Sequence, residues 1–405
     1  MNSRTRRSGA LLHAPRRVPS RARLQSGRRP ALVAILATLG FLVIASQAVA
    51  TPLAQFDRMS YSNQSSPSDA HLQIAVVPDL YATPTYVASL RAASPGIKVL
   101  AYQTLWWMRP SDTSGSSDCL PGKGSYPEAW YMHNGAGARE IWGPGTTNAK
   151  YAMDFSNRSY LAACAAHVMS VIKATGVDGV FFDGSPTSVH WAQLPTSCTL
   201  SPPASATCAT DTNFQTAMTA ALAYMASYLH TNGKIVVSNI SGGNVAFCCH
   251  GGPAIWQKYV SQIDGAMQES WTYGTNHLPL PATEVQAGLL NTAWSEAQGK
   301  YTLVNDDITN CESCDDYGLA SMLLVAAGLS SYDTANGSYN GNYGAWWPSF
   351  ATAQNLGAPL GAYTTLPDGL MVRQFAHGWV AVNDTTASIA DATYGTVPAT
   401  SAIIN

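Results

Sequence analysis

Beyond its first thirty residues, the sequence has few basic side chains. Nine of the 22 lysines and arginines lie before residue 30, which leaves 13 against 24 aspartates and glutamates, a formal net charge of −11 over residues 51–405. Binding of nucleic acid requires a basic surface. The composition therefore argues against a nucleic-acid partner, whereas it does not exclude a neutral or cationic sugar.

Several sequence patterns are also missing. No Gly-x-Gly-x-x-Gly follows the early strand-like segments, so a dinucleotide-binding fold loses its main support. Helix-scale repeats, heptads and low-complexity tracts are absent, which favours one large domain. A metal-dependent hydrolase would need clusters of histidine and aspartate at strand ends, and the sequence does not provide them. We therefore expect neither a cofactor nor a metal.

The N-terminus has the three parts of an export signal. Its arginine-rich start contains no acidic residue, an apolar run without charged residues covers residues 31–50, and the run ends in Ala48-Val49-Ala50. The apolar run is also long enough to span a bilayer, for which about 20 residues suffice. We predict that residues 1–50 are removed after Ala50; an uncleaved signal-anchor is the alternative. Either way, the remainder is expected outside the cytoplasm, in the extracellular space or the cell envelope.

All eight cysteines lie beyond this leader. An even number of cysteines in an exported chain indicates disulfides. One predicted pair is Cys198 with Cys208, in a loop rich in Pro, Ser and Thr. The alternative is a zinc site, in which Cys311 and Cys314 would join the Cys248-Cys249-His250 segment.

The exported chain predicts an α/β fold, a (β/α)₈ TIM barrel over residues 51–355 with a small C-terminal β element over residues 356–405. Short apolar runs alternate with helix-length segments, which is typical of a parallel sheet with crossover helices. Eight strands are expected near residues 57–61, 72–77, 98–103, 179–183, 234–239, 265–269, 301–305 and 328–332. Two further strand-like runs flank His377-Gly378 and predict a hairpin.

Two of these strands are almost copies of each other. Residues 176–183 and 262–269 each contain an apolar residue, Asp-Gly, three further residues and then a carboxylate, which is Asp183 in one and Glu269 in the other. Because side chains alternate along a strand, each carboxylate shares a face with the glycine of its own segment. Both carboxylates should then emerge at the C-terminal mouth, where barrel enzymes keep their active sites.

Glycosidases use such a carboxylate pair, about 5–5.5 Å apart with a nucleophile or about 6.5–9.5 Å apart with a water between. Strand spacing alone is compatible with both distances. We predict that Asp183 and Glu269 are catalytic. The alternative is that Asp183 caps the following turn and Glu269 pairs with a base.

Other side chains near the predicted mouth could contact substrate. Asn239 ends the strand between the two carboxylates, where it could bind a sugar hydroxyl or orient a carboxylate. Tryptophan faces suit pyranose rings, although core packing explains any single tryptophan equally well. The predicted substrate-binding set is Asp79, Gln103, Trp106, Trp107, Asn239, Trp271 and Asp306.

The segment 153–160, which leads into residues 176–183, resembles a broad set of barrel glycosidases. The tail Val372-Arg373-Gln374-Phe375-Ala376-His377-Gly378-Trp379 narrows this resemblance to hypothetical glycosyl hydrolase family 15. The resemblance extends over most of residues 55–390. It implies a barrel with one carboxylate at Asp183 and another at Glu269. The cysteine-bearing insertions do not match the family pattern.

These observations together favour an exported glycoside hydrolase that cleaves O-glycosidic bonds of a polysaccharide or glycoconjugate. Its partner would be the carbohydrate substrate, with membrane contact only through residues 31–50 if the leader is kept. A non-catalytic carbohydrate-binding or cell-surface protein on a degenerate barrel is the second hypothesis, since a fold alone does not establish function.

Overall fold

The structure is a computed structural model of the 405-residue chain. It describes residues 54–57, 71–78, 81–109, 118–121, 126–142, 150–187, 211–240, 252–274, 276–307, 311–335 and 348–405. The predicted leader, Asp79 and the Cys198–Cys208 pair lie outside these ranges. No helix in the described ranges is both long enough and apolar enough to span a bilayer.

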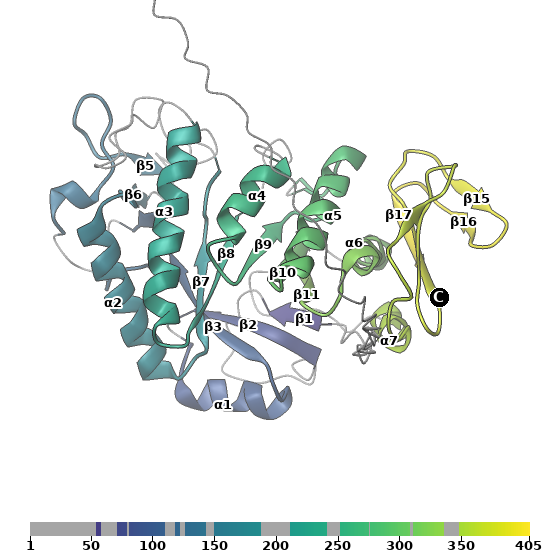
Figure 1. The fold of residues 1–405 in the computed structure, drawn as a ribbon, viewed down its shortest axis with the longest axis horizontal. Helices are drawn as coiled ribbons and strands as arrows, with labels where there is room; N and C mark the ends of the chain where they lie inside the picture. The colour runs from purple at the N-terminus through teal and green to yellow at the C-terminus, as the bar shows by residue number, and fades with distance from the viewer. Residues whose placement is uncertain are drawn as a thin grey trace, which may run out of the picture. The chain divides into compact units, whose positions relative to one another are not determined.

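Eight parallel strands form a closed barrel in the order β1-β11-β10-β9-β8-β7-β3-β2 (Figure 1). The barrel closes because β1 pairs with both β11 and β2. The strands are β1 (Ala54–Asp57), β2 (Leu72–Pro78), β3 (Lys98–Thr104), β7 (Gly179–Asp183), β8 (Ile235–Asn239), β9 (Gly265–Glu269), β10 (Tyr301–Asp307) and β11 (Ser330–Ala335). The predicted fold class is thus confirmed, although β1 begins three residues earlier than expected.

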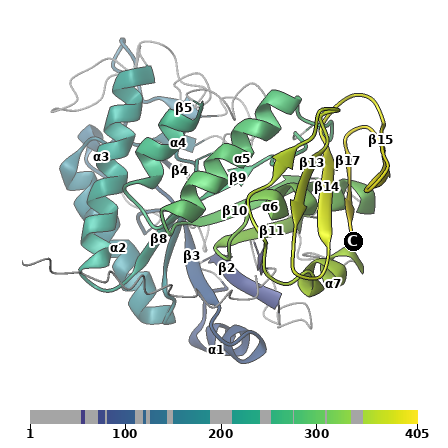
Figure 2. The same ribbon diagram turned by 45° about the vertical axis from the view of Figure 1, so that its right-hand side comes forward.

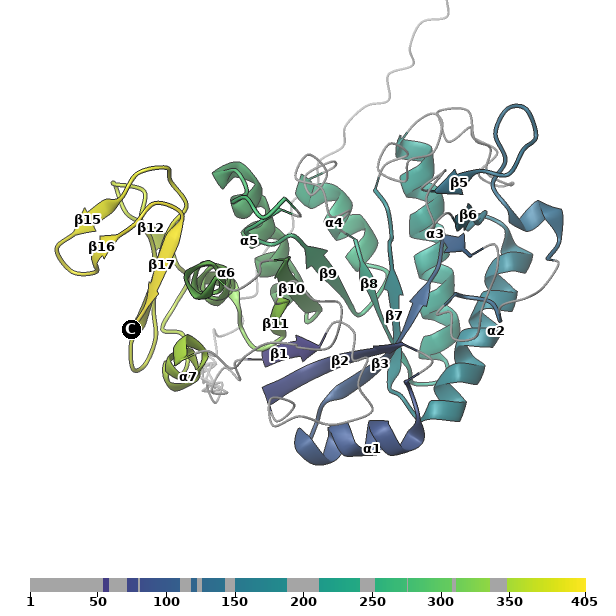
Figure 3. The same cartoon turned by 180° about the vertical axis from the view of Figure 1, so that it is seen from behind.

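Helices surround the barrel on its outer side (Figures 1 and 3). They are α1 (Pro84–Ala93), α2 (Arg158–Thr175), α3 (Asp211–His230), α4 (Gly252–Val260), α5 (Ala282–Ala297), α6 (Glu312–Val325) and α7 (Pro348–Asn355). Local signals fix the ends of α2, where the Asn157 side chain accepts bonds from Ser159 and Tyr160 and Gly176 closes the helix in a left-handed conformation. These caps set where the chain re-enters the barrel as β7.

The two Asp-Gly pairs of the repeated motif lie at the N-terminal ends of β7 and β9. A Cβ at Gly179 would come within 2.0 Å of the Ile235 carbonyl oxygen, so a neighbouring strand requires glycine here. Asp178 accepts a bond from the Val99 amide at 2.9 Å, and Asp264 accepts one from the Val236 amide at 2.8 Å. These aspartates therefore join adjacent strands at the end of the barrel opposite the predicted site.

Apolar side chains fill the barrel interior. The cluster consists of Ile74, Val76, Leu100, Phe181, Val237, Met267 and Leu303, all buried. Phe181 and Met267 each lie two residues before a candidate carboxylate, on the same face of the strand. The packed interior thus points Asp183 and Glu269 toward the barrel mouth, because the alternation continues to the strand ends.

An antiparallel sheet follows the barrel, in the order β12-β13-β14-β17, with a separate β15-β16 hairpin (Figure 2). Its strands are β12 (Thr364–Thr365), β13 (Met371–Gln374), β14 (Trp379–Asn383), β15 (Ile389–Asp391), β16 (Gly395–Val397) and β17 (Ser401–Ile404). Arg373 anchors the sheet to α6, since its Nη1 donates to the carbonyls of Leu323 and Ala326 at 2.8 and 2.7 Å. The sheet shares an apolar cluster with α6 and α7.

A small three-stranded sheet belongs to the long connection between β3 and α2. It contains β4 (Trp107–Met108), β5 (Ile141–Trp142) and β6 (Lys150–Ala152) in the order β4-β6-β5. Figures 1 and 3 both show it beside α2 and α3. Because β4 follows β3 directly, this sheet stands next to the C-terminal ends of β3 and β7.

Candidate active site

One amide group joins the two candidate carboxylates. The Nδ2 of Asn239, at the end of β8, donates to Asp183 Oδ1 at 3.1 Å and to Glu269 Oε2 at 2.9 Å. The two accepting oxygens can therefore be no more than about 6 Å apart. They are about 5 Å apart if each amide hydrogen serves one oxygen. This oxygen spacing is close to the carboxyl separation in glycosidases that form a covalent intermediate, about 5–5.5 Å.

The ladder register explains how two strands present their carboxylates at one level. Phe182 of β7 pairs with Ser238 of β8, whereas Asn239 pairs with Met267 of β9, two residues before Glu269. In a barrel with eight strands and a shear of about eight, residues at equal height advance by about one position per strand. The two-residue offset therefore matches the two strand steps from β7 to β9.

Tyr102 is a fourth side chain at this site, and the sequence analysis missed it. Its hydroxyl donates to Asp183 Oδ2, and its ring stacks on Phe181 with the centroids 6.1 Å apart. Gln103, the predicted ligand from the same strand, is fully buried on the opposite face of β3. Alternation along β3 could have found Tyr102, because Leu100 and Tyr102 face the barrel interior together.

Asp306 supports the loop after Glu269 from within the core. This fully buried carboxylate accepts bonds from the Thr272 amide and hydroxyl, both at 2.6 Å, and from the Tyr273 amide at 2.9 Å. Burial raises its pKa to about 6, although these hydrogen bonds act in the opposite direction. The structure thus makes Asp306 a positioning group for the loop, not the substrate contact predicted from the sequence.

Trp271 occupies the same region and is also buried. No part of its side chain reaches the surface, and its indole Nε1 donates to the Gly318 carbonyl of α6 at 2.9 Å. A sugar would have no ring face to stack on, so the predicted role of Trp271 in substrate binding is replaced by a packing role. Trp271 lies two residues after Glu269 and fixes this strand end against α6.

Trp106 and Trp107 lie on the other side of the site. Trp106 is 1% exposed, and a Cβ at Gly184, directly after Asp183, would come within 2.5 Å of its Nε1. Trp107 is 6% exposed, and the Lys150 ammonium nitrogen lies 3.3 Å from the centroid of its ring. The two indoles therefore pack the wall beside Asp183 rather than offering an open face to a sugar.

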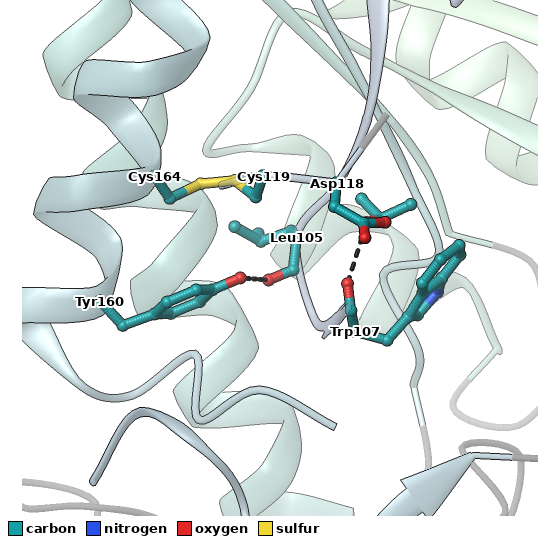
Figure 4. Close-up of a disulfide and its surroundings, with 7 residues drawn as sticks. Leu105, Trp107, Asp118, Cys119, Tyr160 and Cys164 are labelled. Carbon is teal, nitrogen blue, oxygen red and sulfur yellow. Dashed lines mark hydrogen bonds between the residues drawn. A yellow bond between two sulfur atoms is a disulfide. The ribbon is translucent and has the colours of Figure 1, made fainter. Parts of the chain in front are cut away.

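A disulfide fastens this wall to the outer helix layer. Cys119, in the connection after β4, is joined to Cys164 of α2 (Figure 4). The Tyr160 hydroxyl of α2 donates to the Leu105 carbonyl at 2.6 Å, one residue before Trp106. A cross-link over a loop of this length stabilises a fold by about 4 kcal/mol in the chain-entropy model. The wall thus has covalent support that cysteine spacing alone did not predict.

Metal-ligating groups do not gather in the described part of the chain, where no set of three or more His, Cys, Asp or Glu could hold an ion. Cys311 and Cys314 are joined to each other in a disulfide, so these two sulfurs are not free to bind zinc. The residues Cys248-Cys249-His250 and Asp79 lie outside the described ranges. The chemistry available at the described site is that of carboxylates, an amide, a phenol and a lysine.

Acidic residues cluster behind the site, between β10, β11 and α6. Burial raises the pKa of Asp315 to about 8, and the nearby charges of Asp306, Asp316, Asp333 and Glu312 act in the same direction. The pKa of Asp306 is raised to about 6. Both exceed the ordinary value of 3.8, so the folded protein binds protons more tightly than the unfolded chain.

Folding stability is therefore expected to decrease with increasing pH. The contribution of both carboxyls is fully present below about pH 4 and is lost as the pH rises through 6 and then 8. Asp315→Asn keeps the shape of the protonated side chain and cannot ionise. It should raise the free energy of unfolding at pH 8 by about a few kcal/mol and change it little at pH 4. Thermal unfolding across this range checks the slope, with the exposed Asp368→Asn as the control. Equal effects at both pH values would contradict this account.

One protein-family profile matches most of the chain. The profile of hypothetical glycosyl hydrolase family 15 matches residues 91–379. No curated protein sequence matches the chain.

Several solved structures are similar to the chain at low sequence identity. The glycoside hydrolase domain of PelA from Pseudomonas aeruginosa is 12% identical, with 70% of this chain and 96% of that chain covered and a TM-score of 0.44. The cycloalternan-forming enzyme from Listeria monocytogenes is 12% identical, with 88% and 40% covered and a TM-score of 0.46. The maltogenic alpha-amylase AmyB from Thermotoga neapolitana is 9% identical, with 82% and 86% covered and a TM-score of 0.44.

Proposed function

Because this chain belongs to hypothetical glycosyl hydrolase family 15, we propose that it is an exported glycoside hydrolase with Asp183 and Glu269 as its catalytic carboxylates. The substrate is a polysaccharide or glycoconjugate, cleaved at an O-glycosidic bond. The observation that carries this proposal is the contact of one Asn239 amide with both carboxylates, at 3.1 and 2.9 Å. Such a pair at the mouth of a barrel suits acid catalysis on one side of the glycosidic bond and nucleophilic attack on the other.

The hydrogen bonds support a division of roles between the two carboxylates. Asp183 accepts from the Tyr102 hydroxyl and from Asn239, so both of its oxygens face protons from neighbouring donors. This environment suits a carboxylate that acts as an anion, and we assign Asp183 as the nucleophile. Glu269 is then the acid, which protonates the leaving oxygen.

The proposed reaction proceeds in two balanced steps. Asp183 attacks the anomeric carbon while the glycosidic C–O bond breaks, and the leaving oxygen takes the proton of Glu269. Water then attacks the glycosyl ester, gives a proton to Glu269 and releases Asp183 as a carboxylate. Two inversions at one carbon retain the anomeric configuration.

The experiment is a screen of polysaccharides for new reducing ends, with wild type and Glu269→Gln side by side. Proton NMR of the first product then gives the anomer. We expect that only the wild type releases new reducing ends, and that its first product has the anomeric configuration of the substrate. Inverted product would contradict the assigned role of Asp183, since water would then attack directly. Equal release by both proteins would place the active site elsewhere.

The degenerate-barrel hypothesis makes the opposite prediction. A carbohydrate-binding protein without activity would retain a polysaccharide in a binding assay and release no reducing ends. The described site keeps both carboxylates and a shared donor, which favours the enzyme.

The proposal includes export, which rests on the arginine-rich start and the apolar run that ends at Ala50. Protein recovered from the culture medium or the envelope of an expressing bacterium should begin at or near Thr51 on N-terminal sequencing. An intact leader in the membrane fraction would instead show a signal-anchor, since residues 31–50 are long enough to span the bilayer.

A further inference from the structure

An amide without hydrogen-bond partners lies beside the proposed acid. Asn305 of β10 is fully buried, and neither its Nδ2 nor its Oδ1 has a partner in the described part of the chain. Buried polar groups in proteins are nearly always hydrogen-bonded, so each exception calls for an explanation. A buried amide without partners lowers the stability of the resting protein.

The strand directs the Asn305 side chain into the barrel. Asn305 follows Leu303 by two residues, and Leu303 belongs to the apolar cluster of the barrel interior. The next residue, Asp306, points to the outer side and holds the loop after β9. The Asn305 carbonyl accepts from the Trp271 amide at 3.0 Å, which fixes the backbone at this point. The amide is therefore held on the inner face of β10.

Glu269 is the neighbour of Asn305 on that face. The two residues are directly paired between β9 and β10, and adjacent strands lie about 4.8 Å apart. On the other side of Glu269, Asn239 pairs with Met267, two residues before the acid. Because residues at equal height advance by about one position per strand, both asparagines lie one step below Glu269. The acid is thus flanked by two amides at one level, and Asn239 donates to its Oε2 at 2.9 Å.

Two other partners for this amide are less suitable. A sugar in the barrel mouth does not meet Asn305, because none of its side chain is exposed. Asp333 is paired with Asn305 on the β11 side, and by the same advance it lies one step further below the mouth. Glu269 is therefore the neighbour through which Asn305 can act on the reaction.

We propose that Asn305 is a positioning residue for the acid, an inference that rests on the proposed function of Glu269. Glu269 gives its proton to the leaving oxygen as the glycosidic C–O bond breaks, and it is left as a carboxylate. The Nδ2 of Asn305 then donates a hydrogen bond to this carboxylate and keeps its own proton. Hydrogen bonds of catalytic groups often tighten only in the complex with substrate, so the resting structure need not contain this bond.

A donor that gains its partner during the reaction lowers the barrier. Hydrogen bonds to an ionised group are roughly twice as strong as those between neutral groups, and burial strengthens them further. The bond is absent from the resting enzyme, so its free energy acts on the transition state, in which Glu269 acquires negative charge. The stability that the unpartnered amide costs the resting protein is therefore regained as the reaction proceeds.

Asn305→Leu removes the amide and keeps the branched shape of the side chain. With a natural polysaccharide, kcat should fall by about tenfold to a hundredfold, because a charge-assisted hydrogen bond is lost. With an aryl glycoside that has a good leaving group, both the burst of phenol and the turnover that follows should stay close to wild type. Such a substrate needs little protonation, and a Glu269 carboxylate without this donor is at least as strong a base in the second step. Reducing-end release and rapid mixing measure the two rates.

Thr302→Val is the matched control on the same strand. The Thr302 hydroxyl is also fully buried and has no partner in the described part of the chain, but it lies on the outer face of β10. Both substitutions remove a buried polar group without partners, so both should keep or raise the temperature of unfolding. Thr302→Val should leave the kinetics with both substrates unchanged. Should leucine not fit at residue 305, Asn305→Ala is expected to show the same kinetic pattern.

A double variant tests whether Asn305 acts through Glu269. On the polysaccharide, Asn305→Leu should cause no further loss in the Glu269→Gln background. Residues that act as a unit do not have additive effects, whereas independent sites do.

Three results would overturn the inference: an unchanged kcat on the polysaccharide for both Asn305 variants, an equal loss on both substrates, or a further loss in the double variant. Failure of the proposed function looks different. The wild type itself would then release no reducing ends and show no burst, and the inference would fall with it.

Discussion

Asp183→Asn is expected to reduce kcat by roughly 10⁴-fold or more on every substrate, since a neutral amide cannot form the glycosyl ester. Glu269→Gln should cost about 10²–10⁴-fold on a natural polysaccharide, the range for loss of a general acid. The two variants should differ on an aryl glycoside with a good leaving group. Such a substrate needs little protonation, so Glu269→Gln should form the intermediate almost as fast as the wild type, whereas Asp183→Asn should remain inactive.

Rapid-mixing kinetics check this division of roles through the burst of released phenol. Glu269→Gln should show a burst followed by slow turnover, because water then lacks its general base. The control is Asp178→Asn, the same change at the opposite end of β7. The two oxygens of that residue accept from the Val99 amide and from the Arg91 guanidinium, and asparagine can replace only one of these acceptors. The change should therefore lower thermal stability and leave kcat close to wild type. Equal losses for both site variants on activated and natural substrates would refute the assignment.

Asn239→Asp is expected to be the most damaging change that preserves shape. It replaces the amide donor, 3.1 Å from Asp183 and 2.9 Å from Glu269, by a third carboxyl group. Like charges at such distances repel by several kcal/mol in a partly buried site. Near neutral pH, only states in which at least one of the three carboxyl groups is protonated therefore remain accessible. We expect a loss of about 10²–10³-fold in kcat/KM at pH 7, with partial recovery at pH 4–5, where the introduced carboxyl becomes a donor again.

A pH–rate profile of the variant and the wild type tests this expectation. Asn232→Asp adds the same charge in the turn that precedes β8, at the far end of the barrel, and should leave the profile unchanged. Asn239→Ala removes the donor without adding charge, so its loss should be smaller at pH 7 and should not recover in acid. If Asn239→Asp and Asn239→Ala have the same profile, charge repulsion is not the cause.

Buried carboxyl groups set how stable the fold is at the pH of these measurements. The carboxyl cluster of Asp306 and Asp315 lies behind the loop after Glu269, and its raised pKa values favour folding in mildly acidic solution. Activity measurements at low pH, where Asn239→Asp should recover, therefore fall in the range where the fold is expected to be most stable.

The sequence by itself determined the barrel and the positions of its two candidate carboxylates. Side chains alternate along a strand with a period of two. Two segments that both contain Asp-Gly, three residues and a carboxylate therefore form similar strands, and each presents its carboxylate at the same end. The fold class and the location of Asp183 and Glu269 at the ends of β7 and β9 could therefore be predicted from local patterns, and the family from the resemblance of residues 153–160 and 372–379.

Only the tertiary structure decided which other side chains belong to the site. Tyr102 and Gln103 are neighbours in sequence, but one points to Asp183 and the other lies on the far face of β3. Trp271 follows β9 and Asp306 lies near the end of β10, as a ligand would, yet α6 and the loop after β9 bury them completely.

Lys150 is the opposite case, a residue near the site that the sequence analysis did not predict. It carries no motif, and its place over the Trp107 ring depends on the pairing of β6 with β4. Burial and charge at a residue are set by elements that meet only when the barrel closes. Strand periodicity acts between neighbours in the chain and is readable in the sequence, whereas the field around a side chain is the sum of contacts from distant segments and exists only in the folded protein.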